Sequence, residues 1–335
     1  MHKLKQLPED FIVREINSPK FKGQGRYLYY RLIKKNYNTS DIIRKLAKTL
    51  HLKEKQIGFA GNKDKQALTE QAISFKEVNK NRIEKLNFNN IKLEFLGCGD
   101  EPITLGSHLG NYFEIVIRNL EKEKINNINC LENYFDEQRF SGKNCEIGRL
   151  LVKKEFKTAV LLINNLECKN YLKLKPSDTV GALKKLSTRL LKLYVNAYQS
   201  YLWNETVKRY FEQNYVITNK INYSLGEFVF TDENDPDLKI PLLGFGLDSL
   251  KDTKLKKIIE KIMETEKLTS NDFIIKPIPE ISAEGELRTV FVEVKDLVIN
   301  NSEKDDLNSG KKKVKVSFSL PKGSYATMAV RKMVD

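Results

Sequence analysis

A single carboxylate between two lysines is the arrangement in this chain that could do chemistry. Asp64 lies between Lys63 and Lys65 in a turn that follows Gly61. Glycine lets a backbone turn tightly and approach a ligand, and the two ammonium groups favour an ionised acid and attract phosphate. Asp64 is therefore our candidate for a nucleophile or a general base. Taken alone, the same residues are also typical of an ordinary solvated turn.

The spacing of apolar residues predicts the elements that position this turn. Residues 11–16 and 27–33 read as a pair of strands, and 56–60 reads as a short strand that runs directly into the turn. Residues 39–50 have the start signal and the periodicity of a helix. We therefore expect Asp64 to lie at the end of a strand, where a rigid scaffold holds it.

The rest of the chain alternates strand and helix signals without a parallel β-α-β rhythm. Residues 113–117 read as a strand, 125–135 and 190–210 as helices, and the segments 289–294 and 313–320 as a closing hairpin. This pattern favours an α+β fold. The sequence lacks the phosphate-binding loops and the Ser, His and Asp series that nucleotide-dependent enzymes and serine hydrolases require.

The composition indicates a basic protein with an anionic partner. The 335 residues carry a formal net charge of +14, so nucleic acid is the first expectation and an anionic membrane surface the second. A codon bias toward Lys, Asn and Ile could produce the same charge. The four cysteines and three histidines lack metal-site spacing, and no apolar run approaches the length of a membrane span. We expect a cytoplasmic protein without a metal.

Five blocks, in order along the chain, resemble the motifs of the TruD family of pseudouridine synthases. They reach from the N-terminus nearly to the C-terminus, which makes coincidence a poor explanation. The chain departs from the family pattern at Asp136, where glycine is usual, and at 141–143, where the family has Gly-x-Gly. The blocks are 8–15 with Lys5 just upstream, 62–71 around Asp64, 106–118, 133–140 and 318–327.

The resemblance implies a discontinuous catalytic domain with an insertion. The expected fold is the pseudouridine-synthase type, a mixed and mostly antiparallel sheet flanked by helices, with an inserted α/β TRUD domain. By resemblance, residues 1–147 and 284–335 form the catalytic domain and residues 148–283 form the insertion.

The same resemblance implies an isomerase that converts a uridine in tRNA to pseudouridine, with position 13 of the D-arm as the expected target. The reaction breaks the N1–C1′ bond, turns the base and joins C5 to C1′. Because it includes no redox step and no phosphate transfer, one carboxylate can suffice, and we expect no cofactor and no obligatory protein partner. Asp64 would act as the nucleophile or as the base that removes a ribose proton.

The family motifs also suggest roles for the surrounding residues. Lys5 is the expected cation beside Asp64, and Phe135 is the expected aromatic face for a base turned out of its helix. Asn133 would orient the base or Asp64. From periodicity alone Phe135 reads more readily as a core residue, and Arg139 is equally compatible with a structural ion pair and a phosphate contact. The remaining expected substrate contacts are Lys63 and Lys65, facing phosphates, with Thr69 and Gln71.

Two other functions fit parts of the sequence. A catalytically weak RNA-binding protein or RNA chaperone could keep the same fold, although the intact Asp64 argues against this. A base-directed methyltransferase would need an S-adenosylmethionine site, for which the sequence shows no glycine-rich loop.

Overall fold

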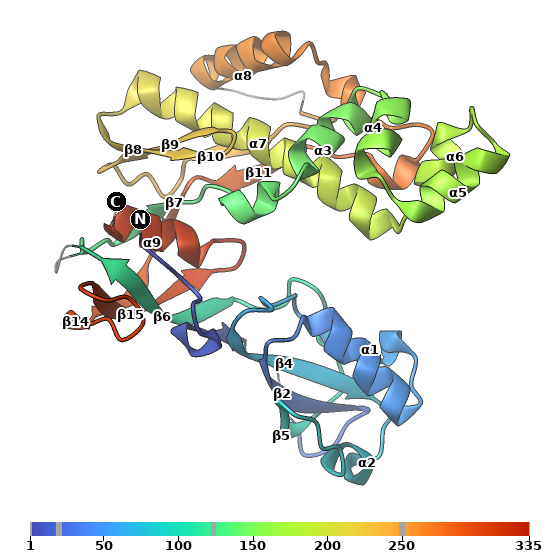
Figure 1. The fold of residues 1–335 in the computed structure, drawn as a ribbon, viewed down its shortest axis with the longest axis vertical. Helices are drawn as coiled ribbons and strands as arrows, with labels where there is room; N and C mark the ends of the chain where they lie inside the picture. Colours follow the sequence, from blue (N-terminus) through green and yellow to red (C-terminus); the bar gives the residue numbers. More distant parts are fainter. Residues whose placement is uncertain (1, 18–21, 122–124, 248–251, 335) are drawn as a thin grey trace. The chain divides into compact units, whose positions relative to one another are not determined.

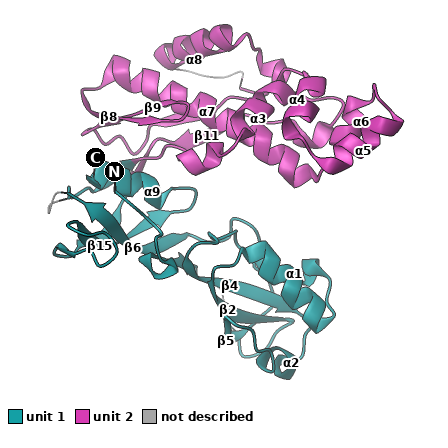
Figure 2. Ribbon diagram, in the orientation of Figure 1, with its two compact units in different colours: residues 1–131, 293–335 teal, residues 132–292 magenta. Residues whose placement is uncertain are grey.

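The chain folds into two compact units in the computed structural model, which describes residues 2–17, 22–121, 125–247 and 252–334. Unit 1 comprises residues 1–131 and 293–335, and unit 2 comprises residues 132–292 (Figures 1 and 2). The insertion expected at 148–283 falls inside unit 2. Its boundaries stay a prediction, because compactness does not show which segment was inserted.

Unit 1 is built on a nine-stranded sheet with the order β13-β15-β6-β1-β4-β2-β5, to which β14 adds on β15 and β3 on β4 (Figure 1). Within this sheet, β1 and β4 are parallel and the other pairs are antiparallel. The expected mixed and mostly antiparallel sheet is therefore confirmed. The strands are β1 (Phe11–Ile16), β2 (Tyr27–Lys35), β3 (Ile57–Phe59), β4 (Leu68–Lys76), β5 (Ile91–Gly99), β6 (Gly110–Leu120), β13 (Lys295–Ile299), β14 (Glu303–Lys304) and β15 (Lys312–Pro321).

Three of the expected elements are wrong in their pairing or type. β1 and β2 do not pair, because β4 lies between them, and a parallel partner leaves no local signal in the sequence. The closing hairpin pairs β15 with β13, not with 289–294. The segment 125–135, which we expected to be a helix, contains the strand β7 (Cys130–Glu132) instead. Its apolar residues are buried although the chain is extended.

Helix α1 (Thr39–Leu50) covers one part of this sheet. Its apolar residues form a stripe, as expected from their spacing, and they pack on inward-facing residues of β2 and β4. The buried cluster includes Ile42, Leu46 and Leu50 from the helix and Leu32 and Ile73 from the strands. Unit 1 also contains α2 (Lys80–Glu84), α9 (Ala326–Val334) and the short helices η1 (Pro8–Asp10) and η2 (Glu54–Gln56).

Unit 2 is organised around α7 (Thr188–Asn214), which extends the helix expected over 190–210 at both ends. Its fully buried Trp203 and Phe211 make edge contacts with Tyr134, whose hydroxyl donates to Val229 O. The other helices are α3 (Asn144–Val152), α4 (Phe156–Ile163), α5 (Leu166–Leu174), α6 (Thr179–Leu183), α8 (Thr253–Glu266), η3 (Glu137–Phe140), η4 (Ser270–Phe273) and η5 (Pro279–Ile281).

Short strands complete unit 2. β8 (Ile217–Tyr223) pairs with β9 (Gly226–Thr231), and β10 (Lys239–Leu242) pairs with β11 (Glu286–Thr289). The strand β7 pairs with β12 (Phe291–Glu293), and these two strands contain the boundaries between the units. In the described part of the chain, no helix is both long enough and apolar enough to cross a membrane.

A buried charge cluster around Arg118 holds the N-terminal segment against the sheet. Arg118 donates two 2.9 Å bonds to the Asp10 carboxylate and one 3.0 Å bond to Asp305, and all three side chains are almost fully buried. The Asp10 carboxylate also accepts a third bond, from Leu7 N, and the backbones of Lys3 and Arg118 form a bridge. The cluster therefore fixes both ends of the segment that carries Lys5.

We expect Asp305→Asn to weaken the fold at neutral pH and to reduce its sensitivity to acid. Burial raises the pKa of Asp305, but bonds from the amides of Asn119 and Leu307, from Asn308 and from Arg118 outweigh it and lower the pKa to about 2. A pKa below its ordinary value of 3.8 gives stability that is present above about pH 4 and is lost as the pH falls toward 2. Removing one partner of a buried ion pair costs about 3 kcal/mol.

Urea unfolding between pH 7 and pH 2 measures this effect. The wild type should lose more stability than Asp305→Asn below pH 4, and Glu101→Gln, at an exposed position of unit 1, should follow the wild type. Equal acid sensitivity of wild type and Asp305→Asn would show that this carboxylate does not contribute.

Candidate active site

Asp64 lies in the loop between β3 and β4, and its carboxylate pairs with Lys5. Lys5 Nζ is 2.6 Å from Asp64 Oδ2, and the two side chains are 17% and 36% exposed. The ammonium also lies 4.2 Å from the centroid of the Phe11 ring. The carboxylate is therefore fixed by a cation from a segment 59 residues away and is still partly open to solvent.

The backbone of Lys5 is strained. Its φ is +58°, a region that residues with a side chain seldom adopt and that costs about 1 kcal/mol or more. The conformation persists because the Arg118 cluster holds the chain on both sides, through the Lys3 bridge and the bond from Leu7 N to Asp10.

Hydrogen bonds from inside the fold hold the Asp64 loop. Gln71 Nε2 donates to Gly61 O at 3.0 Å, Thr39 Oγ1 donates to Gln71 Oε1 at 2.8 Å, and Lys63 N donates to Thr39 Oγ1 at 3.0 Å. Gln71 and Thr69 are both buried. This geometry gives Gln71 a position that supports the loop and leaves Thr69 in the interior, and their role as substrate contacts stays a prediction.

Lys63 is also turned inward. Its ammonium lies 2.7 Å from Asn111 Oδ1 and 2.9 Å from Glu15 Oε2, and the two charged side chains are 6% and 0% exposed. We had expected Lys63 to face a phosphate; in this conformation a buried carboxylate holds its ammonium inside the fold. Lys65, by contrast, is exposed.

A buried lysine that the sequence reading missed lies under the loop. Lys34, near the end of β2, is fully buried, and its Nζ donates to Tyr37 O at 2.7 Å, to Asp64 O at 2.8 Å and to Lys63 O at 3.4 Å. Burial lowers the pKa of Lys34 to about 8, against an opposing effect of Asp64. Lys34 continues the inward alternation of Leu28, Tyr30 and Leu32, which is the signal that could have found it.

Phe135 lies in unit 2, where Asn204 fixes its backbone. Asn204 accepts from Phe135 N at 3.0 Å and donates to Phe135 O at 2.9 Å. The ring is 8% exposed, with the guanidinium of Arg288 4.1 Å from its centroid and Trp203 edge-on. A base could stack on this ring only on its other face or by displacing Arg288.

Asn133 and Arg139 lie close to Phe135 in the same unit. Asn133 is buried, its Nδ2 donates to Thr289 O at 3.2 Å, and its Oδ1 has no donor within the described ranges. Arg139 Nε donates to Ser200 Oγ at 3.2 Å, and its guanidinium lies 5.7 Å from the centroid of the Phe135 ring. The expected site residues thus form two groups, one in each unit.

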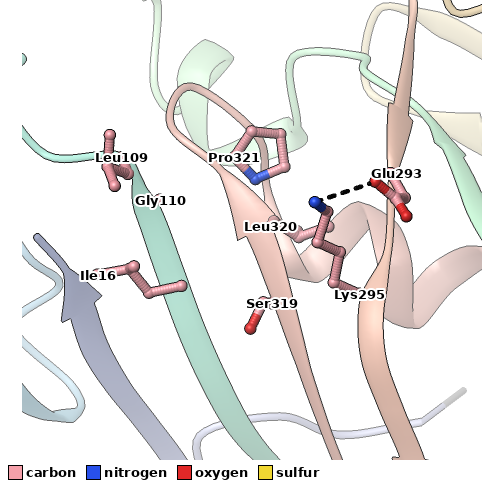
Figure 3. A pocket seen from close by; sticks show the side chains of 8 residues that line it. All are labelled: Ile16, Leu109, Gly110, Glu293, Lys295, Ser319, Leu320 and Pro321. Atoms are coloured by element: carbon pink, nitrogen blue, oxygen red, sulfur yellow. Dashed lines mark ion pairs between the residues drawn. The ribbon is translucent and has the colours of Figure 1, made fainter.

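An apolar pocket in unit 1 contains neither Lys5 nor Asp64. It has a volume of about 390 Å³ and lies at the ends of several strands (Figure 3). Its charged lining residues, Glu293 and Lys295, pair with each other at 3.3 Å. Because it offers no other ionisable group, it is a poorer candidate for chemistry than the Asp64 loop. The lining residues are Ile16, Leu109, Gly110, Glu293, Lys295, Ser319, Leu320 and Pro321.

Comparisons with known proteins agree with the motifs. The family model of tRNA pseudouridine synthase D (TruD) matches residues 2–170 and 164–333. The Aquifex aeolicus tRNA pseudouridine synthase D is 32% identical, over 99% of this chain and 97% of the relative. The crystal structure of a Methanosarcina mazei protein described as tRNA pseudouridine synthase D aligns with a TM-score of 0.70 and 26% identity, over 99% of this chain and 93% of that one. This chain therefore belongs to the TruD family.

Proposed function

We propose that this protein converts a uridine in tRNA to pseudouridine and that Asp64 is the reacting group. The observation that carries the proposal is the 2.6 Å ion pair between Lys5 and Asp64 on a loop held from inside, in a chain of the TruD family. Fixing a reacting group in one geometry lowers the barrier of the reaction it takes part in. The partial exposure of Asp64 leaves the carboxylate reachable by a substrate.

The reaction needs little beyond this carboxylate. The N1–C1′ bond breaks, the base turns within the site, and C5 joins C1′, so the atoms of substrate and product are the same. Asp64 can serve either as a nucleophile toward the sugar or the base, or as the base that removes a ribose proton. In either route Lys5 holds the carboxylate and compensates its charge.

The second group of residues supports binding of the target base. A base inside a helical stack cannot be reached, so the nucleotide must turn out into a pocket and stack there. We propose that Phe135 supplies the stacking face and that Asn133 orients the base through its free Oδ1. The guanidinium of Arg139 lies beside the ring and is available for a phosphate of the same strand.

The wider surface suits a folded RNA. Residues 153–192 contain ten Lys or Arg residues and three Asp or Glu residues, so this stretch carries half of the net charge of +14. We name this stretch the basic segment. Tyr171 of α5 has both Lys175 and Lys185 near its ring, which places lysines of separate elements together. Such a cluster favours binding of phosphates.

The finer expectations follow from the family resemblance. We propose the uridine at position 13 of the D-arm as the target, a cytoplasmic location and action without a cofactor or an obligatory protein partner. Lys65, exposed beside Asp64, is the lysine of this loop best placed for a phosphate.

Substitution of Asp64 is the first test. Asp64→Asn keeps the size of the side chain and removes its charge, so pseudouridine formation should fall by at least about 10²-fold. Unmodified tRNA is incubated with each protein, and pseudouridine is mapped by carbodiimide labelling and primer extension. Glu101→Gln, at an exposed position of unit 1, serves as the matched control. Equal signals from wild type and Asp64→Asn would exclude catalysis by Asp64 and favour the weakly active RNA-binding alternative.

Substitution of Lys5 separates catalysis from binding. The ammonium of Lys5 is paired with Asp64 and is not an exposed surface charge. Lys5→Met should therefore lower kcat by about 10-fold or more, while the Kd for tRNA changes by less than about threefold. Single-turnover rates and filter binding measure the two quantities. A Kd that rises while kcat is retained would assign Lys5 to RNA binding instead.

Charge reversal in the basic segment should have the opposite effect. Each lost phosphate contact lowers the slope of log K against log salt by about 0.7 to 0.9. Lys184→Glu/Lys185→Glu should therefore weaken tRNA binding and flatten its salt dependence, with kcat at saturating tRNA unchanged. The control is Lys256→Glu/Lys257→Glu on α8, an exposed lysine pair among several acidic residues. Equal effects of the two pairs would show that the basic segment is not a specific contact.

A further inference from the structure

We propose that Lys34 is a positioning residue for the reaction, which fixes the backbone of Asp64 from inside the fold. This inference rests on the proposed function, because it takes Asp64 as the reacting group. Its contacts are with backbone carbonyls, so it acts through the loop and not on the substrate.

The location of Lys34 explains why its side chain is buried. Lys34 pairs with Thr69 of β4 on one side and Ile91 of β5 on the other, near the end of β2. Its side chain points to the same face of the sheet as Leu32, toward α1 and the Asp64 loop. A lysine at this position has lost all contact with solvent.

The three donors of the ammonium match three acceptors. Tyr37 O, Asp64 O and Lys63 O lie 2.7, 2.8 and 3.4 Å from Nζ. Among the described residues, no carboxylate lies within ion-pair distance of Lys34, so the cation is held by carbonyl oxygens alone. Buried carbonyls without a donor are costly, so removing the ammonium forces the loop to rearrange.

Asp64 is therefore held by two contacts, one to its backbone and one to its side chain. Lys34 holds its backbone carbonyl, and Lys5 holds its carboxylate at 2.6 Å. The two amines come from separate parts of unit 1, one from β2 and one from the N-terminal segment. The direction of the carboxylate therefore depends on the position of Lys34, and a misplacement of about 1 Å can cost on the order of 10²-fold in rate.

The charged groups that face Lys34 come from the Asp64 loop. Burial lowers the pKa of Lys34 to about 8; Asp64 opposes this shift and Lys63 adds to it. Lys63 is itself paired with Glu15 of β1, and the strand neighbours Thr69 and Ile91 do not titrate. Lys34 is thus an ammonium at pH 7 and becomes an amine within the range of an enzyme assay.

Deprotonation should lower kcat without weakening the fold. An amine has two N–H donors, so one of the three carbonyls loses its partner above about pH 8. The pKa in the folded state lies below its ordinary value of 10.5, so the unfolded chain binds more protons between these values. The contribution of this group to stability therefore rises with pH from about 8 to 10.5. Loss of activity in this range would not reflect unfolding.

The first experiment compares Lys34→Met with Lys92→Met. Lys92 lies on β5 of the same sheet and its side chain is 70% exposed, so the control removes an equal charge without touching the loop. We expect kcat for pseudouridine formation to fall on the order of 10²-fold in Lys34→Met, with KM for tRNA within about threefold of the wild type. Folding is checked by thermal unfolding. A folded Lys34→Met with wild-type kcat overturns the proposal.

The second experiment uses the pH dependence of the rate and a variant that keeps a positive charge. The kcat of the wild type, measured from pH 6.5 to 9.5 at saturating tRNA, should fall with an apparent pKa of about 8. Lys34→Arg, whose guanidinium stays charged, should lack this alkaline limb whatever its maximal rate. An alkaline limb that is identical in wild type and Lys34→Arg assigns the titration to another group and overturns the proposal.

Hydrogen exchange tests the positioning role without any turnover. Lys63 N donates to Thr39 Oγ1 and Ala67 N donates to Lys65 O, so both amides report on the order of the loop. Their exchange should be at least about 10-fold faster in Lys34→Met than in Lys92→Met, and unchanged exchange overturns the proposal. A wild type that makes no pseudouridine while the loop still loosens in Lys34→Met would defeat the proposed function and leave the loop contact supported.

Discussion

The geometry of the candidate site is set by the contacts of Asp64 with two amines. A carboxylate in a flexible turn would sample many directions, and here it is fixed through its oxygen by Lys5 and through its backbone by Lys34. Both amines are themselves held, Lys5 by the strained segment that Arg118 anchors and Lys34 by complete burial. The site is therefore a property of the sheet and not of the 62–71 motif alone.

The order of the strands makes this arrangement possible. β1 follows the Lys5 segment, and β4 follows the Asp64 loop. Because β1 and β4 pair in parallel, the starts of the two strands lie side by side. β2 lies on the other side of β4 and brings Lys34 opposite Thr69. Three segments far apart in the sequence thus meet at one end of the sheet. The residues proposed to hold the base belong to unit 2 and have a separate support in Asn204 and Trp203.

Local sequence patterns predicted individual helices and strands, but they did not predict the contacts between segments that are far apart in the sequence. Helices α1 and α7 follow from apolar spacing, and the ion pair of Lys5 with Asp64 was expected from the family motifs. The position of β4 between β1 and β2 leaves no periodic trace in either strand. Lys63 looked like a surface residue because the buried Glu15 that pairs with it lies 48 positions earlier. Lys34 was overlooked because a lysine rarely occupies an inward position.

A double-mutant cycle on Lys5 and Asp64 shows whether the two residues act as one unit in the reaction. Single-turnover rates of pseudouridine formation are compared for wild type, Lys5→Met, Asp64→Glu and the double variant. If the pair acts as one unit, the substitutions are strongly non-additive, and the double variant is about as slow as the slower single variant. Rate losses that simply multiply would show that Lys5 and Asp64 act independently and that their ion pair does not contribute to the reaction.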